Sequence, residues 1–366
     1  MRQIASIEIR TTVSELQSIV GCYLKKFYDL GEGSFRMLFS STAGNQVVYI
    51  KLLQTINKTV MIEEVDEPTN FAKAIRKRIL GMKVKSVTQR YADRIITIEF
   101  TSPEEEPKLI VEMFGKGNLI LTNQENEIMI CYHVAKQRER ETSPHSIYQF
   151  PQGKKIVLSE LGLAQAEEII EALKESNDRL IKELSNNIDI GPLYLEDIII
   201  ASGMDPKSKA SELANKEVLA ENLINFIKQS ETPRPRIYSK AGKYEDYAIS
   251  PINKYRGLEA KEFKTLSEAL EEFYSEDRTK LDKDEEEVNE ILANIEKQKS
   301  ITAELNKSEK EYTEAGHKIF ERMQEINQMI DYINVHRRVT LEELQSTFGI
   351  KIKSIDLKNK NVVIDL

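Results

Sequence analysis

The sequence predicts an α+β protein with a β-rich N-terminal domain, a helical domain and one long helix. Three observations lead to this class. Short apolar runs separated by turn residues fill residues 22–134, which is typical of antiparallel strands. Apolar residues recur at helical spacing within residues 156–230. Residues 284–338 contain no proline and a single glycine, Gly316, which predicts a continuous helix.

The N-terminal region is expected to begin with a helix over residues 11–20, where apolar residues have helical spacing. A second helix, with one apolar and one basic face, is expected over residues 68–80. The strands are expected at residues 22–28, 34–40, 46–52, 59–64, 83–89 and 95–100, with further runs to residue 134. Together they form a meander of antiparallel strands flanked by helices.

The middle region predicts a helix over residues 158–184 and then a helix-hairpin-helix over residues 187–199. Gly191 lies in the hairpin, and Pro192 stands where a helix begins. A hairpin glycine exposes backbone N–H groups that suit a nucleic-acid phosphate. The hairpin also carries Asp189 and no adjacent lysine or arginine, so structural packing is the alternative. A strand hairpin is expected over residues 237–247.

The long helix has a narrow apolar stripe and would span about 80 Å, so it needs a partner helix. Either two copies associate through it, or the sequence ends before a returning arm. A short helix over residues 341–348 and a hairpin follow. The expected divisions are residues 1–155, 156–230, 231–275, 276–340 and 341–366.

Composition limits the classes of protein. The chain has 366 residues and a net charge of -8, and no apolar run approaches the length of a membrane-spanning helix. The N-terminus lacks the apolar core of a signal peptide. Cys22 and Cys131 are the only cysteines, and the four histidines lack metal-ligand spacing. We therefore expect a cytoplasmic protein without a disulfide, metal, cofactor or membrane contact.

A block of cations interrupts this acidic composition. Seven lysines and arginines, with no acid among them, occur between Phe71 and Arg90: Lys73, Arg76, Lys77, Arg78, Lys83, Lys85 and Arg90. The turn Tyr91-Ala92-Asp93-Arg94 follows immediately. Such a block is typical of a polyanion site, and the alternative is a solvated helix face with an ordinary Asp-Arg surface pair.

A second basic candidate is the turn Gly115-Lys116-Gly117-Asn118. Its glycines permit a positive φ and a close approach of another backbone. Lys116 then contacts a phosphate backbone, or the turn is simply a tight strand connection.

The sequence contains none of the catalytic or cofactor motifs that we considered. Phosphate-binding loops, dinucleotide-binding glycine patterns, zinc spacings and nucleophile elbows are all missing. We therefore expect no catalytic residue, and binding remains as the function.

Several segments, in order and at matching spacing, resemble one family. They are residues 1–3, 6–8, 68–71, 75–77, 89 with 93–95, 112 with 115–121, and 148 with 150–151. These segments are similar to the NFACT family, the NEMF/RqcH proteins also called fibronectin-binding protein A-like. The resemblance continues to about residue 340, and these proteins normally continue to a second coiled-coil arm and an NFACT-R domain.

The resemblance also speaks against an enzyme. The NFACT N-terminal domain is itself similar to the N-domain of formamidopyrimidine-DNA glycosylases, which need an N-terminal proline amine followed by a glutamate. Here Arg2 and Gln3 stand in those places. Glu8 is a carboxylate nearby, but no amine nucleophile accompanies it.

The family function implied is ribosome-associated quality control. Such a factor binds the large ribosomal subunit with its rRNA and peptidyl-tRNA, and recruits tRNA for untemplated C-terminal tailing of the nascent chain. Asp93 and Arg94 match the family pair required for tRNA recruitment, and Glu8 stands where most relatives have an aspartate. The expected RNA-binding residues are Asp93, Arg94, Glu8, Arg76, Lys77, Arg90 and Lys116. The alternative is a surface adhesin or coiled-coil scaffold that binds proteins.

Overall fold

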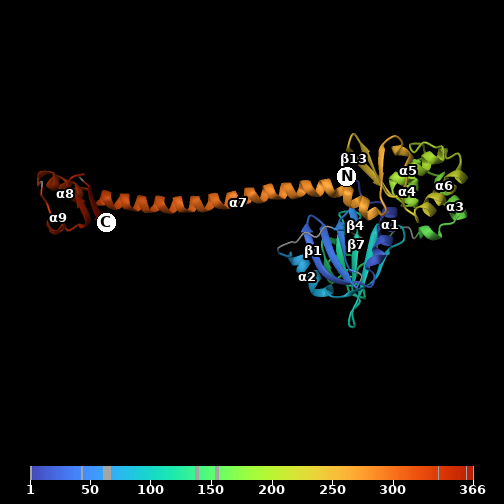
Figure 1. Ribbon diagram of the computed structural model, residues 1–366, viewed down its shortest axis with the longest axis horizontal. Coiled ribbons are helices and arrows are strands. Elements are labelled where there is room, and N and C mark those ends of the chain that lie inside the picture. The colour runs from blue at the N-terminus through green and yellow to red at the C-terminus, as the bar shows by residue number, and fades with distance from the viewer. Residues whose placement is uncertain are drawn as a thin grey trace. The chain divides into compact units, whose positions relative to one another are not determined.

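The computed structural model describes residues 2–42, 44–60, 67–136, 140–152, 156–336, 338–359 and 361–365, with only the backbone described for 276–294 and 296. The chain forms two compact units, Met1–Asp277 and Arg278–Leu366 (Figure 1). The candidate functional residues lie in the first unit.

A nine-stranded antiparallel sheet dominates the first unit, in the order β4-β3-β2-β1-β5-β6-β7-β8-β9. Its strands are β1 Tyr23–Gly31, β2 Ser34–Ser41, β3 Gly44–Lys51, β4 Thr55–Thr59, β5 Lys83–Gln89, β6 Ile95–Thr101, β7 Lys108–Glu112, β8 Asn118–Thr122 and β9 Ile128–Cys131. The two meanders, β1–β4 and β5–β9, join where Tyr23 pairs with Lys83. A strand was expected over residues 59–64, but β4 covers Thr55–Thr59 and shares only Thr59 with it. Residues 61–64 of the expected strand lie outside the described residues.

The sheet curls around one apolar core. Helix α2 (Asn70–Ile79) contacts both β1 and β9, which four other strands separate in the sheet order. Rings of Phe35, Phe71 and Tyr132 meet there, with centroid distances of 4.9 to 5.7 Å. The Tyr132 hydroxyl also accepts a hydrogen bond from the Gly33 N–H at 3.0 Å. These contacts connect the two meanders on the side opposite their strand pairing.

Helix α1 (Ser6–Leu16) starts earlier than the apolar spacing predicted. The reason is local, because the Glu8 carboxylate accepts from the Ala5 N–H at 2.7 Å and so caps the first turn. The helix packs against β4 and β5. Ile9 and Leu16 enter the sheet core, whereas Ile7 belongs to the core of the helical domain. Helix α1 therefore bridges both cores.

The helical domain contains α3 Leu163–Leu173, α4 Leu180–Asn187, α5 Pro192–Ala201 and α6 Lys216–Gln229. The single helix expected over residues 158–184 is wrong: the Ser176 hydroxyl accepts from the Asp178 N–H at 3.1 Å in a turn between α3 and α4. The expected hairpin is confirmed as β12 Arg236–Lys240 and β13 Lys243–Ala248, and β14 Glu259–Glu262 adds a third strand. These strands share one core with the helices.

Helix α7 (Leu266–Glu321) has 56 residues. It begins well before residue 284, where the long helix was predicted to start. Its first turns are held in the first unit, where Leu266 and Leu270 are fully buried. The Leu266 N–H donates to the Glu15 carboxylate of α1 at 2.6 Å. Among the described helices none carries an apolar stretch of the kind a bilayer-spanning segment requires.

The second unit has a small core of its own. It contains α8 Met323–Val335, α9 Leu341–Phe348, β15 Lys351–Asp356 and β16 Asn361–Asp365. The expected helix over residues 341–348 is confirmed, and the long helix ends at Glu321 instead of running to residue 338. Met329, Leu344 and Ile352 form the centre of this core.

Candidate nucleic-acid interface

The turn at residues 90–94, here called the Asp-Arg corner, connects β5 to β6. The Arg90 N–H donates to the Ile95 carbonyl at 3.1 Å, and the Asp93 N–H donates to the Arg90 carbonyl at 2.9 Å. Tyr91 adopts a positive φ of 48°, which lets the chain reverse within these few residues. Ala92 is 6% exposed and belongs to the core of the helical domain. The corner is therefore packed against the neighbouring domain.

The first turn of α1 is hydrogen-bonded to the corner through Gln89. The Gln89 side-chain amide donates both to the Ser6 carbonyl and to the Asp93 carbonyl, each at 2.8 Å. The Ser6 hydroxyl in turn donates to the Asp189 carbonyl in the α4–α5 hairpin, residues 188–191. Three segments that are distant in sequence thus meet around Ser6.

The hairpin glycine is required by this packing. Gly191 has a φ of 102°, and a Cβ at that position would lie 2.5 Å from the Ala5 Cβ. A side chain there is excluded both by backbone conformation and by space. The structural-packing interpretation of Gly191 is therefore confirmed.

Arg94 projects beside this junction and stays partly exposed. Its Nη1 donates to the Gln3 Oε1 at 2.7 Å. The positive charge of Arg94 also acts on the Asp189 carboxyl and lowers its pKa, against a larger rise that desolvation causes. Asp189 has no basic neighbour in the sequence of the hairpin, and Arg94 supplies one in the fold.

Arg90 lies over aromatic rings on the other side of the turn. Its guanidinium carbon is 3.8 Å from the ring centre of Phe150 and 5.1 Å from that of Tyr91. Its Nε is 3.9 Å from the Asp93 carboxylate. Such stacking fixes the guanidinium plane while its edge remains able to donate hydrogen bonds.

The corner is balanced in charge. Desolvation raises the pKa of Asp93, Arg90 lowers it, and the nearby charge of Asp189 raises it further. Two arginines, Arg90 and Arg94, therefore interact with two carboxylates. The corner offers directed hydrogen-bond donors and an acceptor, and is not a diffuse cationic patch.

The block of seven cations is divided among three places: four lie on α2, Lys83 and Lys85 lie on β5, and Arg90 follows the end of β5. The polyanion site inferred from this block stays a prediction. Along β5, Lys83 pairs with Thr101 at one end and Gln89 with Ile96 at the other. Six residue steps in a strand span about 20 Å, so Lys83 stands at the end of β5 opposite to the Asp-Arg corner.

The two candidates on α2 differ from each other. Arg76 donates from Nε to the Phe27 carbonyl at 2.7 Å and lies over the Tyr28 ring at 5.1 Å. It therefore ties α2 to the sheet. Lys77 is exposed on the same helix, and its contact with RNA stays a prediction.

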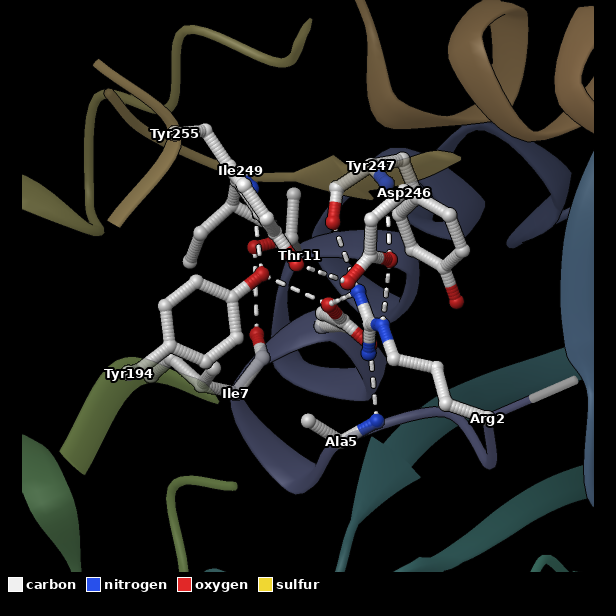
Figure 2. A network of polar contacts seen from close by, with 10 residues as sticks. Arg2, Ala5, Ile7, Thr11, Tyr194, Asp246, Tyr247, Ile249 and Tyr255 are labelled. Carbon is white, nitrogen blue, oxygen red and sulfur yellow. Dashed lines mark hydrogen bonds and ion pairs between the residues drawn. The ribbon is translucent and has the colours of Figure 1, made fainter. Parts of the chain in front are cut away.

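Glu8 lies in a buried polar network and not on an RNA-accessible surface. Figure 2 shows Arg2, Tyr194 and Asp246 of this network converging from three parts of the chain. Its carboxylate accepts two hydrogen bonds from Arg2, at 2.9 and 2.5 Å, and one from the Tyr194 hydroxyl at 2.6 Å. The Tyr194 hydroxyl accepts from the Ile249 N–H at 3.1 Å. With its side chain 0% exposed, Glu8 is not positioned to touch RNA as the sequence suggested.

The same network extends through Arg2 into β13. Arg2 donates from Nε to Asp246 at 2.7 Å and from Nη2 to the Tyr247 carbonyl at 2.7 Å. Its guanidinium also lies 4.2 Å from the centre of the Tyr247 ring, and Asp246 accepts from the Tyr255 hydroxyl at 2.6 Å. Sequence reasoning missed these partners, because Arg2 and Asp246 are 244 residues apart and share no motif. The one local signal was Glu8 at the third helical position after Ala5.

Lys116 is exposed at the tip of the β7–β8 turn. Its neighbours Gly115 and Gly117 have φ values of 62° and 72°. A Cβ on Gly117 would lie 2.7 Å from the Leu52 Cβ. Glycine at this position therefore allows Leu52, in the β3–β4 turn, to pack closely against the β7–β8 turn. The tight connection is thus confirmed, and the phosphate contact of Lys116 stays a prediction.

Metal-binding geometry is not found in the described part of the chain. No group of three or more histidine, cysteine, aspartate or glutamate side chains is placed there to hold a metal ion. Cys22 is buried and Cys131 is partly buried, and both are free thiols.

The curved sheet, the helical domain packed on it and the charged corner at their junction define a two-domain α+β scaffold. The buried network around Glu8 and the Asp-Arg corner both lie where the domains meet. The chain belongs to the family of NFACT N-terminal and middle domains, whose model matches residues 6–360.

Curated relatives agree with this assignment. The chain is 26% identical over 330 residues to the archaeal Rqc2 homolog aRqcH of Methanocaldococcus jannaschii, covering 86% of this chain and 48% of that protein. It is 22% identical over 307 residues to ribosome quality control complex subunit NEMF of Mus musculus, covering 74% of this chain and 28% of that one. The chain thus spans about half of the first relative and less of the second.

Solved structures with the same fold include two bacterial proteins. The fibrinogen binding protein from Staphylococcus aureus has a TM-score of 0.62 at 20% identity, covering 74% of this chain and 98% of that one. The N-terminal part of the fibronectin/fibrinogen-binding protein from Streptococcus suis has a TM-score of 0.60 at 19% identity, covering 75% and 99%. At this identity the likeness concerns the fold alone.

Proposed function

We propose that this chain acts in ribosome-associated quality control in the cytoplasm. It binds the large ribosomal subunit that carries peptidyl-tRNA, contacts rRNA, and recruits tRNA for untemplated C-terminal tailing of the stalled nascent chain. The observation that carries the tRNA part of the proposal is Arg94, partly exposed and held at the domain junction beside Asp93.

The chemistry of the corner suits RNA recognition. A guanidinium offers a fork of donors to a phosphate or to a guanine edge, and a carboxylate accepts from a base amine. Because Gln3 orients Arg94 and Gln89 fixes the backbone of Asp93, both groups are preorganised before RNA arrives. Arg90 and Tyr91 add a stacking surface for an unpaired base.

The proposal is for binding without catalysis. Near the N-terminus, Arg2 is bound to two carboxylates, those of Glu8 and Asp246, and Glu8 is itself saturated by hydrogen bonds. These groups hold the domains together and offer no free nucleophile or general base. For the adhesin alternative no specific site is found among the described residues. The fold is shared with fibrinogen- and fibronectin-binding proteins, and at 20% identity a shared fold carries no information about partners.

Gradient co-sedimentation tests the proposal. The chain is expected to migrate with large subunits that carry nascent-chain tRNA, and to migrate less with empty large subunits. Added tRNA is expected in the same fractions for the wild type and to be lost with Arg94→Ala. Arg256→Ala serves as the matched control, because Arg256 is an exposed arginine remote in sequence from the corner. A chain that stays at the top of the gradient under both conditions would rule the proposal out.

A further inference from the structure

A cavity of about 470 Å³ opens beside the β7–β8 turn, and Phe114 of its lining packs against the same apolar cluster as Phe150. Three segments line it: the end of β7 with the β7–β8 turn, residues 133–136, and the chain around Arg140 and Thr142. Its volume lies within the range of small-ligand sites, which is about 300 to 1,000 Å³.

The charges that line this cavity favour an anion. Lys116, Lys136 and Arg140 line it together with one carboxylate, Glu112, and Lys136 is itself paired with the Glu141 carboxylate at 3.2 Å. The Glu112 carboxylate is already bound, because Arg140 and the Tyr148 hydroxyl both donate to it, the latter at 2.8 Å. The Glu112 charge is therefore neutralised locally, and Lys116 has no hydrogen-bond or ion-pair partner within the described residues.

The cavity has a fixed frame. The Asn118 amide donates to the His133 carbonyl at 2.8 Å, and its oxygen accepts from the His133 N–H at 2.9 Å. Gly117 is fixed against Leu52 on the other side of the turn. Phe114 adds an apolar surface to the lining. The recess thus combines an aromatic ring, an imidazole and the ammonium group of Lys116.

A chain of side-chain contacts through two aromatic rings links Arg140 of the cavity to the Asp-Arg corner. The guanidinium of Arg90 lies over Phe150, whose ring packs against Tyr148 with centroids 4.9 Å apart. The guanidinium of Arg140 lies 4.9 Å from the centre of the Tyr148 ring. Both arginines lower the pKa of Tyr148, against a larger rise due to burial, so both charges act at the same place.

We propose that this cavity binds one unstacked nucleotide of the RNA that the corner contacts. Its phosphate lies against Lys116 and Arg140, and its base lies against Phe114 and His133. RNA-binding proteins commonly take bases out of single-stranded loops in this way, since an unpaired base exposes its face and its edges. The inference rests on the proposed function and names the part of the RNA that is read.

The test compares Lys116→Glu with Lys243→Glu in the full chain. Lys243 is also an exposed lysine in a tight strand hairpin with a glycine beside it, so the two changes are matched. With tRNA, Lys116→Glu is expected to weaken binding roughly tenfold and to reduce the salt slope by about 1, while Lys243→Glu changes neither. With a fully paired RNA hairpin closed by a non-nucleotide linker, both variants are expected to bind as the wild type does.

Photocrosslinking locates the base directly. With tRNA that carries 4-thiouridine, crosslinks are expected in residues 114 and 133, and they are expected to disappear with Lys116→Glu. Equal tRNA affinity of the two lysine variants, or crosslinks only elsewhere, would overturn the proposal while Arg94-dependent binding still stood.

A third experiment measures the binding of free mononucleotides. Adenosine and guanosine 5′-monophosphates, titrated by calorimetry, separate a general nucleotide pocket from one that works only within an RNA chain. Lys116-dependent binding of either supports the cavity even if tRNA binding fails. Failure of both tRNA and mononucleotide binding would contradict the cavity and the proposed function together.

Discussion

Arg94 donates to Gln3 at 2.7 Å across 91 residues of sequence, and this hydrogen bond connects the N-terminal segment to the Asp-Arg corner. Gln3 is exposed, and it is preceded by Arg2 of the buried network. The side chain that orients Arg94 is therefore itself held by the junction between the domains.

The first prediction concerns this pair. Arg94→Ala is expected to lower tRNA affinity by roughly ten- to a hundredfold, because hydrogen bonds from a charged donor are lost. Gln3→Ala is expected to lower it roughly threefold, since Arg94 remains but is less well oriented. The double variant is expected to match Arg94→Ala, which a double-mutant cycle on fluorescence-measured affinities checks. Strictly additive effects would show that Gln3 acts independently of Arg94.

The second prediction concerns Glu8. Glu8→Ala is expected to lower the free energy of unfolding by about 3 kcal/mol, because it leaves the Arg2 guanidinium uncompensated in a largely buried site. Denaturant unfolding measures this loss. Glu32→Gln is the control, because its side chain is 79% exposed and its ion pair with Lys51 is long at 3.7 Å. A Glu8→Ala variant as stable as the control would show that the network contributes no stability.

The third prediction uses the raised pKa of Asp93. An acid whose pKa is higher in the folded state destabilises the fold when it is ionised, and this cost vanishes once pH falls below the ordinary value of 3.8. Asp93→Asn is therefore expected to be slightly more stable at pH 7, by less than about 1 kcal/mol, and equal to wild type below pH 3.8. Its tRNA affinity is expected to fall at the same time. Thermal melts across pH and binding at pH 7 distinguish this result from a simple loss of structure.

The fourth prediction concerns the hairpin glycine. Gly191→Ala is expected to destabilise the first unit by about 3 kcal/mol, because its Cβ would meet that of Ala5 at 2.5 Å in a left-handed backbone. Gly203→Ala is the matched control, since Gly203 has a φ of 74° but open space around it. Its cost is expected to be about 1 kcal/mol from backbone strain alone. Equal melting temperatures for the two variants would contradict the close packing of the hairpin on α1.

Local patterns predicted much of the fold. The strand at residues 83–89 and the helix at residues 341–348 have the expected ends, because alternation and caps are local signals. The start of α1 was missed because its cap depends on the buried carboxylate of Glu8. The break between α3 and α4 was missed because a hydroxyl–backbone turn at Ser176 interrupts an otherwise helical spacing.

The candidate site was predicted less completely. Asp93 and Arg94 were recognised from their turn and from the family resemblance, yet their orientation depends on Gln3, Gln89 and Ser6. The block of cations was recognised from the sequence, but a linear sequence does not show how it is divided between α2, β5 and the corner. Long-range partners such as Arg2 with Asp246 have no signature in a single sequence.

The central claim is that the Asp-Arg corner contacts RNA. The most direct measurement is a map of protein–RNA crosslinks on the chain bound to tRNA-carrying large ribosomal subunits. We predict tRNA crosslinks in residues 89–94, lost in Arg94→Ala and retained in Arg256→Ala. Crosslinks to tRNA that fall only on α2, around Lys77, and leave the corner unlabelled would contradict the claim.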